Sequence, residues 1–590
     1  MTECQMLSLD FRFPLRIITT LRDRLYVQQL VGGVQLPVQA IGIDFGTTNC
    51  SASVYRNGRL EFIPLEDGRS ILPSTICITQ DQEVSFGREA VQRYLTLTRE
   101  TPIRYQFTDL REFTSVFEEE VESREFIESD HGLVVVSSAG GEQELETPAR
   151  LFQSLKTGLR DPNFHGTTVY ERYYAIEDLI GLILRHIRER AEAYLGEPVN
   201  SAVIGRPVSY APSDRPPSLT VEHIDQAAHE RMLVAARIAG FDYAALEFEP
   251  VAATRHLHRD MESGSCALVF DFGGGTLDLA LSRAVGEAAP EIVATYGIPL
   301  GGDDFDSAIM EHSLLKHFGQ GTTLGPKKLA FPENLLAPLL HWQTIPLLAA
   351  PASMAHIAAI KRQSNVPQTM TNLQILVRQG LGFELFQLIE AAKIALSEQS
   401  FAQISLHEKG LDIEERLTRA AFVAAIGDHL VQIERALLAV LGQARVEPEQ
   451  VDAVLMTGGS SLVPAVQGTV RRILGANKVR AADPFMSIVA GLGIIAAQDD
   501  ICVPVAGAVS SATEARLKAE AVTIGERVSF MRGQQTVEGL VVRRAGGRLH
   551  DATLVIEFWD DEVQEFVSTV RHETKVTRLK EPGSDHAQAQ

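Results

Sequence analysis

Apolar and polar positions follow the same order in two places of this chain: an apolar run, a small polar turn and a second apolar run. The four runs cover 41–45 and 50–56, then 268–272 and 277–281. Runs of this length bounded by small turn residues are typical of β-strands. The dipeptide Asn57-Gly58, which follows 50–56, favours a type I′ hairpin turn. The pattern therefore predicts two strand–turn–strand units.

The two turns have a composition suited to binding phosphate. They read Gly46-Thr47-Thr48 and Gly273-Gly274-Gly275-Thr276, and such small residues let consecutive N–H groups point into one concavity. The preceding strands end with Asp44 and Asp271, whose carboxylates can hold a hydrated Mg²⁺. Because a strand and not a helix follows each turn, a Walker loop and a dinucleotide fingerprint are both disfavoured. We expect two half-sites that face one nucleotide.

Predicted strands and helices alternate over 40–498 with short Gly/Pro punctuation, which is typical of an α/β architecture. The two Gly/Thr turns are far enough apart for one lobe each, so we expect a first lobe at 40–255 and a second at 256–498. Within the second lobe, the Leu/Ala/Pro-rich stretch at about 306–390 predicts an inserted helical subdomain, with Trp342 in its core.

A third glycine turn joins a buried run at 451–457 to an amphipathic helix that ends at Leu474. Its residues Gly458, Gly459 and Ser460 would lie near a helix N-terminus, where free N–H groups can meet a phosphate or a ribose. Turns of this kind are also common as purely structural features. Beside the two hairpin turns, the ligand-binding interpretation is favoured.

The helix predicted at 384–399 has an apolar stripe and, on another face, Glu390, Lys393 and Ser397. That polar face is either an ordinary solvated surface or a surface that binds ribose hydroxyls and the edge of a base. The residues alone leave both interpretations open.

The pattern changes after residue 498. We expect a linker rich in Ala, Val and Ser at 499–522 and a small β domain, an SH3-like barrel or a meander, at 523–580. Its four alternating runs cover 526–531, 536–543, 552–559 and 565–571. We expect 581–590 to be a disordered tail and 1–39 to be a disordered or accessory extension.

Composition narrows the class of protein. The net charge of −22 over 590 residues argues against a nucleic-acid or anionic-membrane partner. Five cysteines without CxxC spacing indicate neither a disulfide framework nor a zinc site, and His256 and His258 are expected at the surface. No apolar run reaches the roughly 18 residues of a membrane span. We expect a cytoplasmic monomer.

Nine motifs in this order resemble the seventy-kilodalton heat-shock chaperones, a family of the actin and sugar-kinase superfold. The resemblance covers about 40–498 and implies a two-lobed actin-like ATPase, built from duplicated ribonuclease-H-like domains with helical insertions, that uses ATP/ADP and Mg²⁺. It also implies client-protein and cochaperone partners. The motifs lie at 43–49, 72–74, 86–90, 205–207, 249–253, 271–278, 300–306, 390–397 and 458–460.

The same resemblance implies a role for individual residues. The metal would be held, mostly through water, by Asp44, Asp271 and Asp278. Catalysis would use Lys156, Glu249, Asp271 and Thr276. The nucleotide would be bound by Gly46, Thr47, Thr48, Gly273, Gly274, Gly275, Gly301, Gly302, Glu390, Lys393, Ser397, Gly458, Gly459 and Ser460. Pro207 either terminates a strand or acts as a γ-phosphate switch, for which Arg215 is the nearest arginine partner.

Three departures from the family pattern indicate a divergent, short bacterial branch. Ile394 and Leu462 stand where the family clamps the adenine with arginines, and Phe485 stands where it has an acidic residue. The C-terminal residues are also too few for the usual peptide-binding sandwich and lid. Two alternative functions remain in the same superfold: a small-molecule, sugar-type kinase and a filament-forming structural protein.

Overall fold

The computed structural model describes most of the chain between residues 40 and 578. The described residues are 40–99, 104–107, 143–146, 148–161, 164, 166–170, 172–212, 215, 219–258, 261–286, 288–408, 410–480, 486–498, 501–505, 527–532, 535–545, 553–560, 565–572 and 576–578. The extension expected at 1–39, Phe485, the tail at 581–590 and most of the expected linker lie outside them.

The first sheet begins with an antiparallel meander and continues with parallel strands. Its order is β23-β13-β12-β1-β2-β3, with β4 also pairing with β2. The type I′ hairpin is confirmed, because Asn57 and Gly58 both have positive φ, 52° and 74°. The strands are β1 Ala40–Phe45, β2 Asn49–Arg56, β3 Arg59–Phe62, β4 Ile71–Pro73, β12 Ser201–Arg206, β13 Tyr243–Phe248 and β23 Val503–Pro504.

The second sheet repeats this plan. Its order is β16-β15-β14-β21-β22, in which β14, β15 and β16 are antiparallel and β21 and β22 run parallel to β14. Both Gly/Thr turns therefore join the first two strands of a meander, as the pattern predicted. The strands are β14 Cys266–Phe272, β15 Leu277–Arg283, β16 Glu291–Ile298, β21 Ala453–Thr457 and β22 Val479–Arg480.

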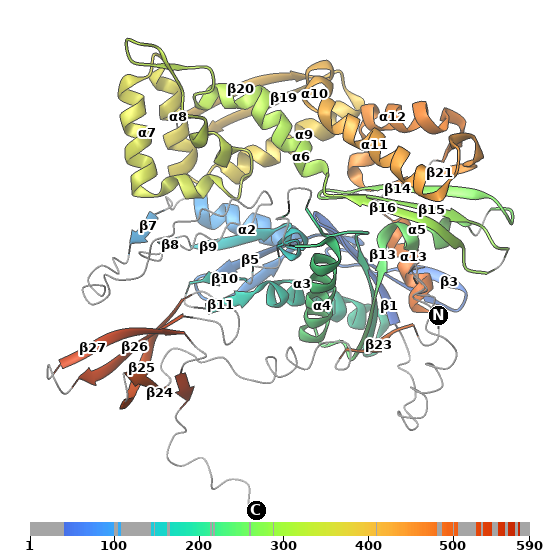
Figure 1. Cartoon of the computed structure of the whole chain (residues 1–590), viewed down its shortest axis with the longest axis horizontal. Coiled ribbons are helices and arrows are strands. Elements are labelled where there is room, and N and C mark those ends of the chain that lie inside the picture. Colours follow the sequence, from blue (N-terminus) through green and yellow to red (C-terminus); the bar gives the residue numbers. More distant parts are fainter. Residues whose placement is uncertain are drawn as a thin grey trace, which may run out of the picture. The chain divides into compact units, whose positions relative to one another are not determined.

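Two helices lie between the sheets, α5 Glu249–Leu257 and α13 Ser487–Ala496 (Figure 1). Helix α13 packs on β1 and β2 and against α5, which packs in turn on β14 and β15. Small residues permit this close approach: a Cβ on Gly491 would collide with the backbone of Ala252. Helices α3 Ile176–Leu195 and α4 Val221–Ile238 cover the first sheet, and α11 Gly427–Ala444 and α12 Pro464–Leu474 the second (Figure 1).

Between β16 and β21 the chain forms a helical region whose apolar core is continuous with that of the second sheet. Met370, Leu373 and Leu376 are buried there. The helices are α6 Gly302–Ile309, α7 Pro351–Gln363, α8 Pro367–Arg378, α9 Gly382–Glu398 and α10 Arg419–Ala425, and the strands β19 Phe401–Glu408 and β20 Leu411–Thr418 form a hairpin between α9 and α10. Trp342 is only half-buried and lines a cavity, so it is not a core residue as the sequence suggested.

Two smaller groups of elements complete the described part of the chain. Near the first sheet, β5 Thr75–Thr79 pairs with β6 Val84–Phe86 and β9 Ala149–Gln153, and α2 Gly87–Arg99 packs on β5. At the C-terminal end a five-stranded antiparallel sheet has the order β27-β26-β25-β24-β28. Its strands are β24 Arg527–Arg532, β25 Gln535–Ala545, β26 Thr553–Asp560, β27 Glu565–His572 and β28 Val576–Arg578.

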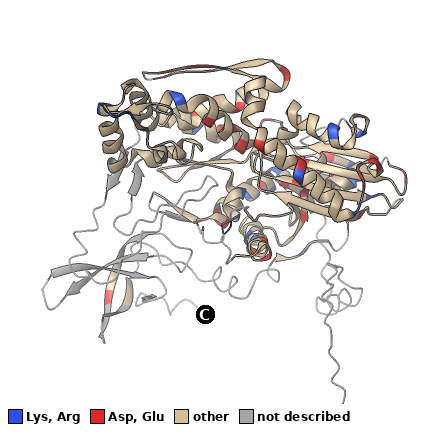
Figure 2. Ribbon diagram, turned by 45° about the horizontal axis from the view of Figure 1, so that its top comes forward, with Lys and Arg blue, Asp and Glu red and all other residues tan. Residues whose placement is uncertain are grey.

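The four runs predicted at the C-terminal end correspond to β24–β27, and β28 was not predicted. No helix of the described residues is long and apolar enough to cross a membrane. Figure 2 shows acidic and basic positions interspersed over the described helices and sheets.

Candidate functional site

The two Gly/Thr turns face each other with little space between them. A Cβ on Gly274 would collide with the Thr48 hydroxyl, and a Cβ on Gly275 would lie 2.9 Å from Thr47 Oγ1. The first turn is held by Ser74, whose hydroxyl donates to the Gly46 carbonyl at 2.7 Å. Gly274 and Gly275 therefore have no room for a side chain beside the first turn, whereas the Cβ position of Gly273 is open and its N–H donates to the Thr276 carbonyl at 3.1 Å.

Three carboxyl groups lie at the ends of the paired strands. Asp271 is directly opposite Asp278 in the β14–β15 pair, whereas the residue opposite Asp44 is Ser51. Burial, and after it the charge of Glu249, raises the pKa of Asp44 and of Asp278 to about 7. Burial and the same neighbouring carboxylates also raise the pKa of Asp271 well above its usual value.

These carboxyl groups fit a hydrated divalent cation better than a directly ligated one, because no three acidic, His or Cys side chains of the described residues form a group that could hold a metal ion. Asp278 Oδ1 accepts the Val208 N–H at 2.7 Å, but its Oδ2 is buried and has no hydrogen-bond partner among the described residues. Thr276 lies close enough to lower the pKa of Asp278 through its hydroxyl. Crowded carboxyl groups with raised pKa values become stable as carboxylates when a cation binds between them.

Lys156 and Glu249 form a buried ion pair beside this cluster. Lys156 is on the 3₁₀ helix η2 Leu155–Leu159, and Glu249 is the first residue of α5. Burial alone would lower the pKa of Lys156, but the charge and hydrogen bond of Glu249, together with the charges of Tyr210 and Asp44, outweigh burial and the pKa is raised. The alternative of a surface lysine is thereby excluded, because Lys156 is only 6% exposed.

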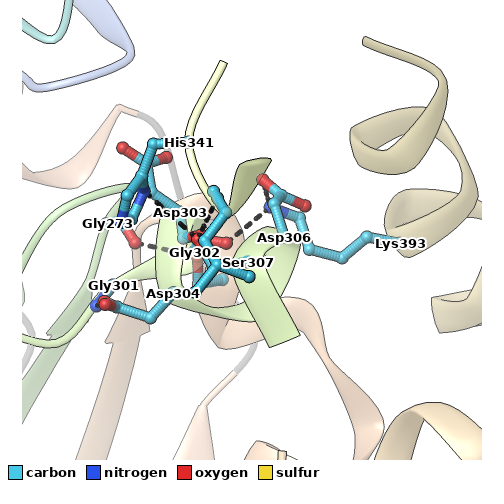
Figure 3. Close-up of polar contacts among 11 residues, drawn as sticks. Gly273, Gly301, Gly302, Asp303, Asp304, Asp306, Ser307, His341 and Lys393 are labelled. Carbon is cyan, nitrogen blue, oxygen red and sulfur yellow. Dashed lines mark hydrogen bonds and ion pairs between the residues drawn. The ribbon is translucent and has the colours of Figure 1, made fainter. Parts of the chain in front are cut away.

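The N-terminus of α6 approaches the second turn (Figure 3). The Gly302 N–H donates to the Gly273 carbonyl at 3.0 Å, and a Cβ on Gly301 would collide with the Gly274 backbone. Lys393 on α9 donates to the Gly302 carbonyl at 2.9 Å and to Asp306 Oδ2 at 2.7 Å. The backbone of the second turn, the start of α6 and Lys393 on α9 are therefore linked: the second turn bonds to Gly302, and Gly302 bonds to Lys393.

The third glycine turn also contacts the second Gly/Thr turn. Ser460 Oγ donates to the Gly273 carbonyl at 2.8 Å, and a Cβ on Gly458 would collide with the Phe272 backbone. Gly459 opens the short 3₁₀ helix η10 Gly459–Leu462. The turn is thus bonded to the phosphate-binding loop and is more than a generic strand-to-helix connection.

The polar face of α9 is not a freely solvated surface. Glu390, Lys393 and Ser397 are all half-buried, whereas Ile394 is 62% exposed and Leu462 on η10 is 43% exposed. Two large apolar side chains thus remain open to solvent on the elements that the resemblance assigns to the nucleotide base.

A cavity of about 450 Å³ opens beside the two turns. Its walls come from the first turn, α2, η2, the N-terminus of α6, the segment around Trp342 and α9. The residues that line it include Thr48, Gly275, Arg160, Asp303, Arg88, Trp342, Phe383 and Glu390.

Sequence reasoning missed part of this site. Asp303 and Asp306 lie within a recognised motif, and burial raises their pKa to about 7 and about 6, yet neither was assigned a role. Arg160 carried no signal, because no local motif surrounds it. His258 was expected at the surface but is buried, with Nε2 2.8 Å from Ser282 Oγ. Arg215 is exposed.

A duplicated sheet plan with two facing phosphate-type turns defines a two-lobed protein of the actin-like class. The sequence model of the family described as "Hsp70 protein" matches residues 40–156, 154–328 and 369–502. The chain therefore belongs to the Hsp70 family and has its two-lobed actin-like fold. The match leaves out 329–368 and everything after 502.

Individual relatives agree with this assignment. The chain is 28% identical over 466 residues to the chaperone protein dnaK3 of Synechococcus elongatus, covering 77% of this chain and 49% of the relative. It is 28% identical over 465 residues to the chaperone protein DnaK of Thermus thermophilus, covering 77% of this chain and 60% of that protein. The chain thus spans about half to three-fifths of the length of these relatives.

Proposed function

We propose that this chain binds Mg·ATP between the two Gly/Thr turns, hydrolyses it slowly, and uses lobe closure to control its binding of a client polypeptide or partner. The observation that carries the proposal is the convergence of both turns on the carboxyl cluster and the Lys156–Glu249 pair. The names of the relatives, chaperone proteins, support the client-binding part.

Each residue has a chemical task in this proposal. Backbone N–H groups of both turns, with the hydroxyls of Thr47 and Thr48, would bind the phosphates. Lys156 would neutralise charge that develops on the γ-phosphate, and Glu249 would orient the attacking water. Asp44, Asp271 and Asp278 would hold Mg²⁺, mostly through water, and the ion would supply positive charge that neutralises the phosphates.

The base would be bound differently from the phosphates. Glu390, Lys393 and Ser397 would contact the ribose and base edge, beside Ser460 in the third turn. Ile394 and Leu462 would pack on the purine through aliphatic carbons, without the cation–π contribution of an arginine, about 0.5–2 kcal/mol. We therefore expect modest discrimination between ATP and GTP.

The segment after strand β12 connects the first sheet to the carboxyl cluster. Strand β12 ends at Arg206, which is consistent with Pro207 as a strand terminator, and the next residue, Val208, donates its N–H to Asp278. We propose that Pro207 also acts as a switch, because a change at Asp278 on nucleotide binding would move this segment.

Binding and hydrolysis of Mg·ATP by the purified chain test the proposal. Asp271→Asn and Lys156→Ala should each lower turnover by about a hundredfold or more, because each removes a charge that stabilises the transition state. Asp412→Asn and Lys316→Ala are matched controls, since both side chains are more than half exposed and lie away from the site. If neither site variant changed affinity or turnover, the assignment would be wrong.

A second set of assays separates the alternative functions. Stimulation of turnover by an unfolded polypeptide supports the chaperone-like function, whereas phosphorylation of a sugar would support a kinase and nucleotide-dependent sedimentation a filament. A truncation for these assays should end after Val505 and not after Gln498, because β23 pairs with β13 in the first sheet. We propose a monomer without nucleic-acid or membrane partners.

A further inference from the structure

Arg160 lies at the end of a short turn that reaches both Gly/Thr loops. The turn starts at Ser154, which is left-handed with φ 57°, and continues as η2, whose residues are all buried. Leu155 and Leu159 anchor it in the core beside the first sheet. Lys156 on this turn pairs with Glu249, and four residues later Arg160 Nη2 donates to the Gly275 carbonyl at 2.6 Å.

The guanidinium of Arg160 is buried without a direct ion pair, although the charges of Asp304, Asp303 and Asp278 act on it. Arg160 is 5% exposed, and no carboxylate of the described residues forms an ion pair with it. Arg231 is equally buried but is fully satisfied: its Nε donates to Glu177 at 3.0 Å, and its two terminal nitrogens donate to backbone carbonyls. Burial of a cation without a directly bonded anion is unfavourable, and here burial lowers the pKa of Arg160 in spite of those carboxyl groups. An anion that bonded directly to the guanidinium would therefore stabilise it.

The unused donors of Arg160 are positioned for a ligand. A guanidinium has five N–H donors, and only Nη2 has a described acceptor. Its other nitrogens are not among the buried atoms that lack a partner, and Arg160 lines the cavity with Thr48, Gly275 and Asp303. Those donors therefore border the cavity and are not sealed inside the protein.

Arg160 also lies at the point where the two turns meet. A Cβ on Gly275 would lie 2.9 Å from Thr47 Oγ1 and 3.0 Å from Arg160 Nη2. The other cations of the site are already paired: Lys156 with Glu249, Lys393 with Asp306 and Arg88 with Glu66. Among the described cations of the site, Arg160 is thus the one that can neutralise an added negative charge.

We propose that Arg160 binds the terminal phosphate of the nucleotide and so makes this site prefer ATP over ADP; the inference rests on the proposed ATP function. The guanidinium donates one hydrogen bond to the Gly275 carbonyl, and its remaining N–H groups would donate to the phosphate. Because this side chain is carried by η2 and contacts a loop of the second sheet, bound ATP ties the two lobes together more firmly than ADP does.

Equilibrium binding of ATP and ADP to the full chain tests the inference, with the same Mg²⁺ and salt concentrations for both. Arg160→Gln should weaken ATP binding about ten- to a hundredfold, the effect of losing a charge-assisted hydrogen bond, and ADP binding less than about threefold. Arg160→Lys should restore part of the ATP preference, because it keeps the charge. Arg185→Gln, an exposed arginine that donates to the Ile238 carbonyl, is the control and should change neither affinity.

Melting temperatures without nucleotide show whether the variants fold. An equal loss of ATP and ADP affinity in Arg160→Gln would mean that Arg160 only holds the Gly275 loop, and would overturn the inference. Unchanged affinities would overturn it too. Failure of the unaltered chain to bind Mg·ATP would instead refute the proposed function, so the two failures can be told apart.

Discussion

At the scale of single residues, burial of carboxyl groups dominates the chemistry of this site. Asp44, Asp271 and Asp278 all have raised pKa values, and in each case burial is the largest cause and the Glu249 charge the second. The charge of Lys156 lowers these three pKa values, but by less than burial and Glu249 raise them. Without a bound cation the cluster therefore retains protons near neutral pH, which links its protonation to folding as well as to ligand binding.

The first prediction concerns the pH dependence of stability. Asp278 has a pKa of about 7 when folded and a usual value of 3.8, so between about pH 4 and pH 7 the folded state binds more protons than the unfolded chain. Its contribution to stability is complete at low pH and is lost as the pH rises through 7. In metal-free protein Asp278 should lower the unfolding free energy by up to about 1.4 kcal/mol per pH unit in this window.

Urea unfolding in the presence of a chelator between about pH 5 and pH 8 measures this slope. Asp278→Asn should have a shallower slope than the unaltered chain, because the amide does not titrate. Asp412→Asn, in which an 82% exposed carboxyl is replaced, should keep the original slope. Equal slopes in all three proteins would show that Asp278 is already ionised when the metal is absent.

The sequence predicted site residues where a motif placed them on one loop, and failed where the fold supplied the contact. The Gly/Thr turns and strand-end aspartates could be identified because their spacing follows from strand geometry. Arg160 could not, since its role comes from a contact with Gly275, 115 positions away. His258 looked exposed because its polar partner, Ser282, is on another strand.

At the scale of elements, close packing of backbones shapes the site. The β14–β15 turn, the N-terminus of α6 and the turn before η10 approach one another at Gly274, Gly301 and Gly458. Side chains at Gly301 and Gly458 would force the elements apart, since the neighbours there are backbone atoms that cannot rotate away, and a side chain at Gly274 would meet the Thr48 hydroxyl. The phosphate-binding geometry therefore depends on three elements that meet without side chains between them.

The second prediction is that Gly301→Ala disrupts this contact. Its Cβ would collide with the Gly274 backbone, so we expect a loss of about 1–3 kcal/mol in unfolding free energy and at least tenfold weaker nucleotide binding. Gly468→Ala is the matched control. Gly468 lies within α12 with open space around its Cβ position, so alanine should stabilise the helix by up to about 1 kcal/mol and leave binding unchanged. Normal nucleotide affinity in Gly301→Ala would contradict the proposed role of this contact.

Local patterns predicted individual elements better than their packing. Strands β14 and β21 are buried along their whole length, as their continuous apolar runs indicated. Helix α13 follows the second sheet in the chain but packs on the first sheet. Periodicity could not predict this packing. It depends on close backbone contacts such as Gly42 against Gly493, which no sequence window contains.

At the scale of the whole molecule, an aromatic cluster connects the lobes at the cavity. Tyr94 on α2 meets Phe383 on α9 edge to face, with ring centroids 5.9 Å apart, and Trp342 meets Phe383 at 4.9 Å. Trp342 lies in 329–368, the internal segment that the Hsp70 family match leaves out. The contact between the lobes is thus made by two residues within the match, Tyr94 and Phe383, and the unmatched segment adds Trp342, which packs on Phe383 from the same lobe.

The third prediction is that this aromatic cluster slows nucleotide release. Opening the cleft must separate Tyr94 from Phe383, and an aromatic pair contributes about 0.5–1.5 kcal/mol beyond simple burial. Tyr94→Leu and Trp342→Leu should therefore increase the dissociation rate of a fluorescent ATP analogue about two- to tenfold in stopped-flow measurements. Phe401→Leu, which alters a 44% exposed ring on the β19–β20 hairpin, should leave the rate unchanged. If Tyr94→Leu and Trp342→Leu released the analogue at the unaltered rate but had a lower melting temperature, the cluster would stabilise the fold without restraining the cleft. Nucleotide release would then be governed by the phosphate contacts alone.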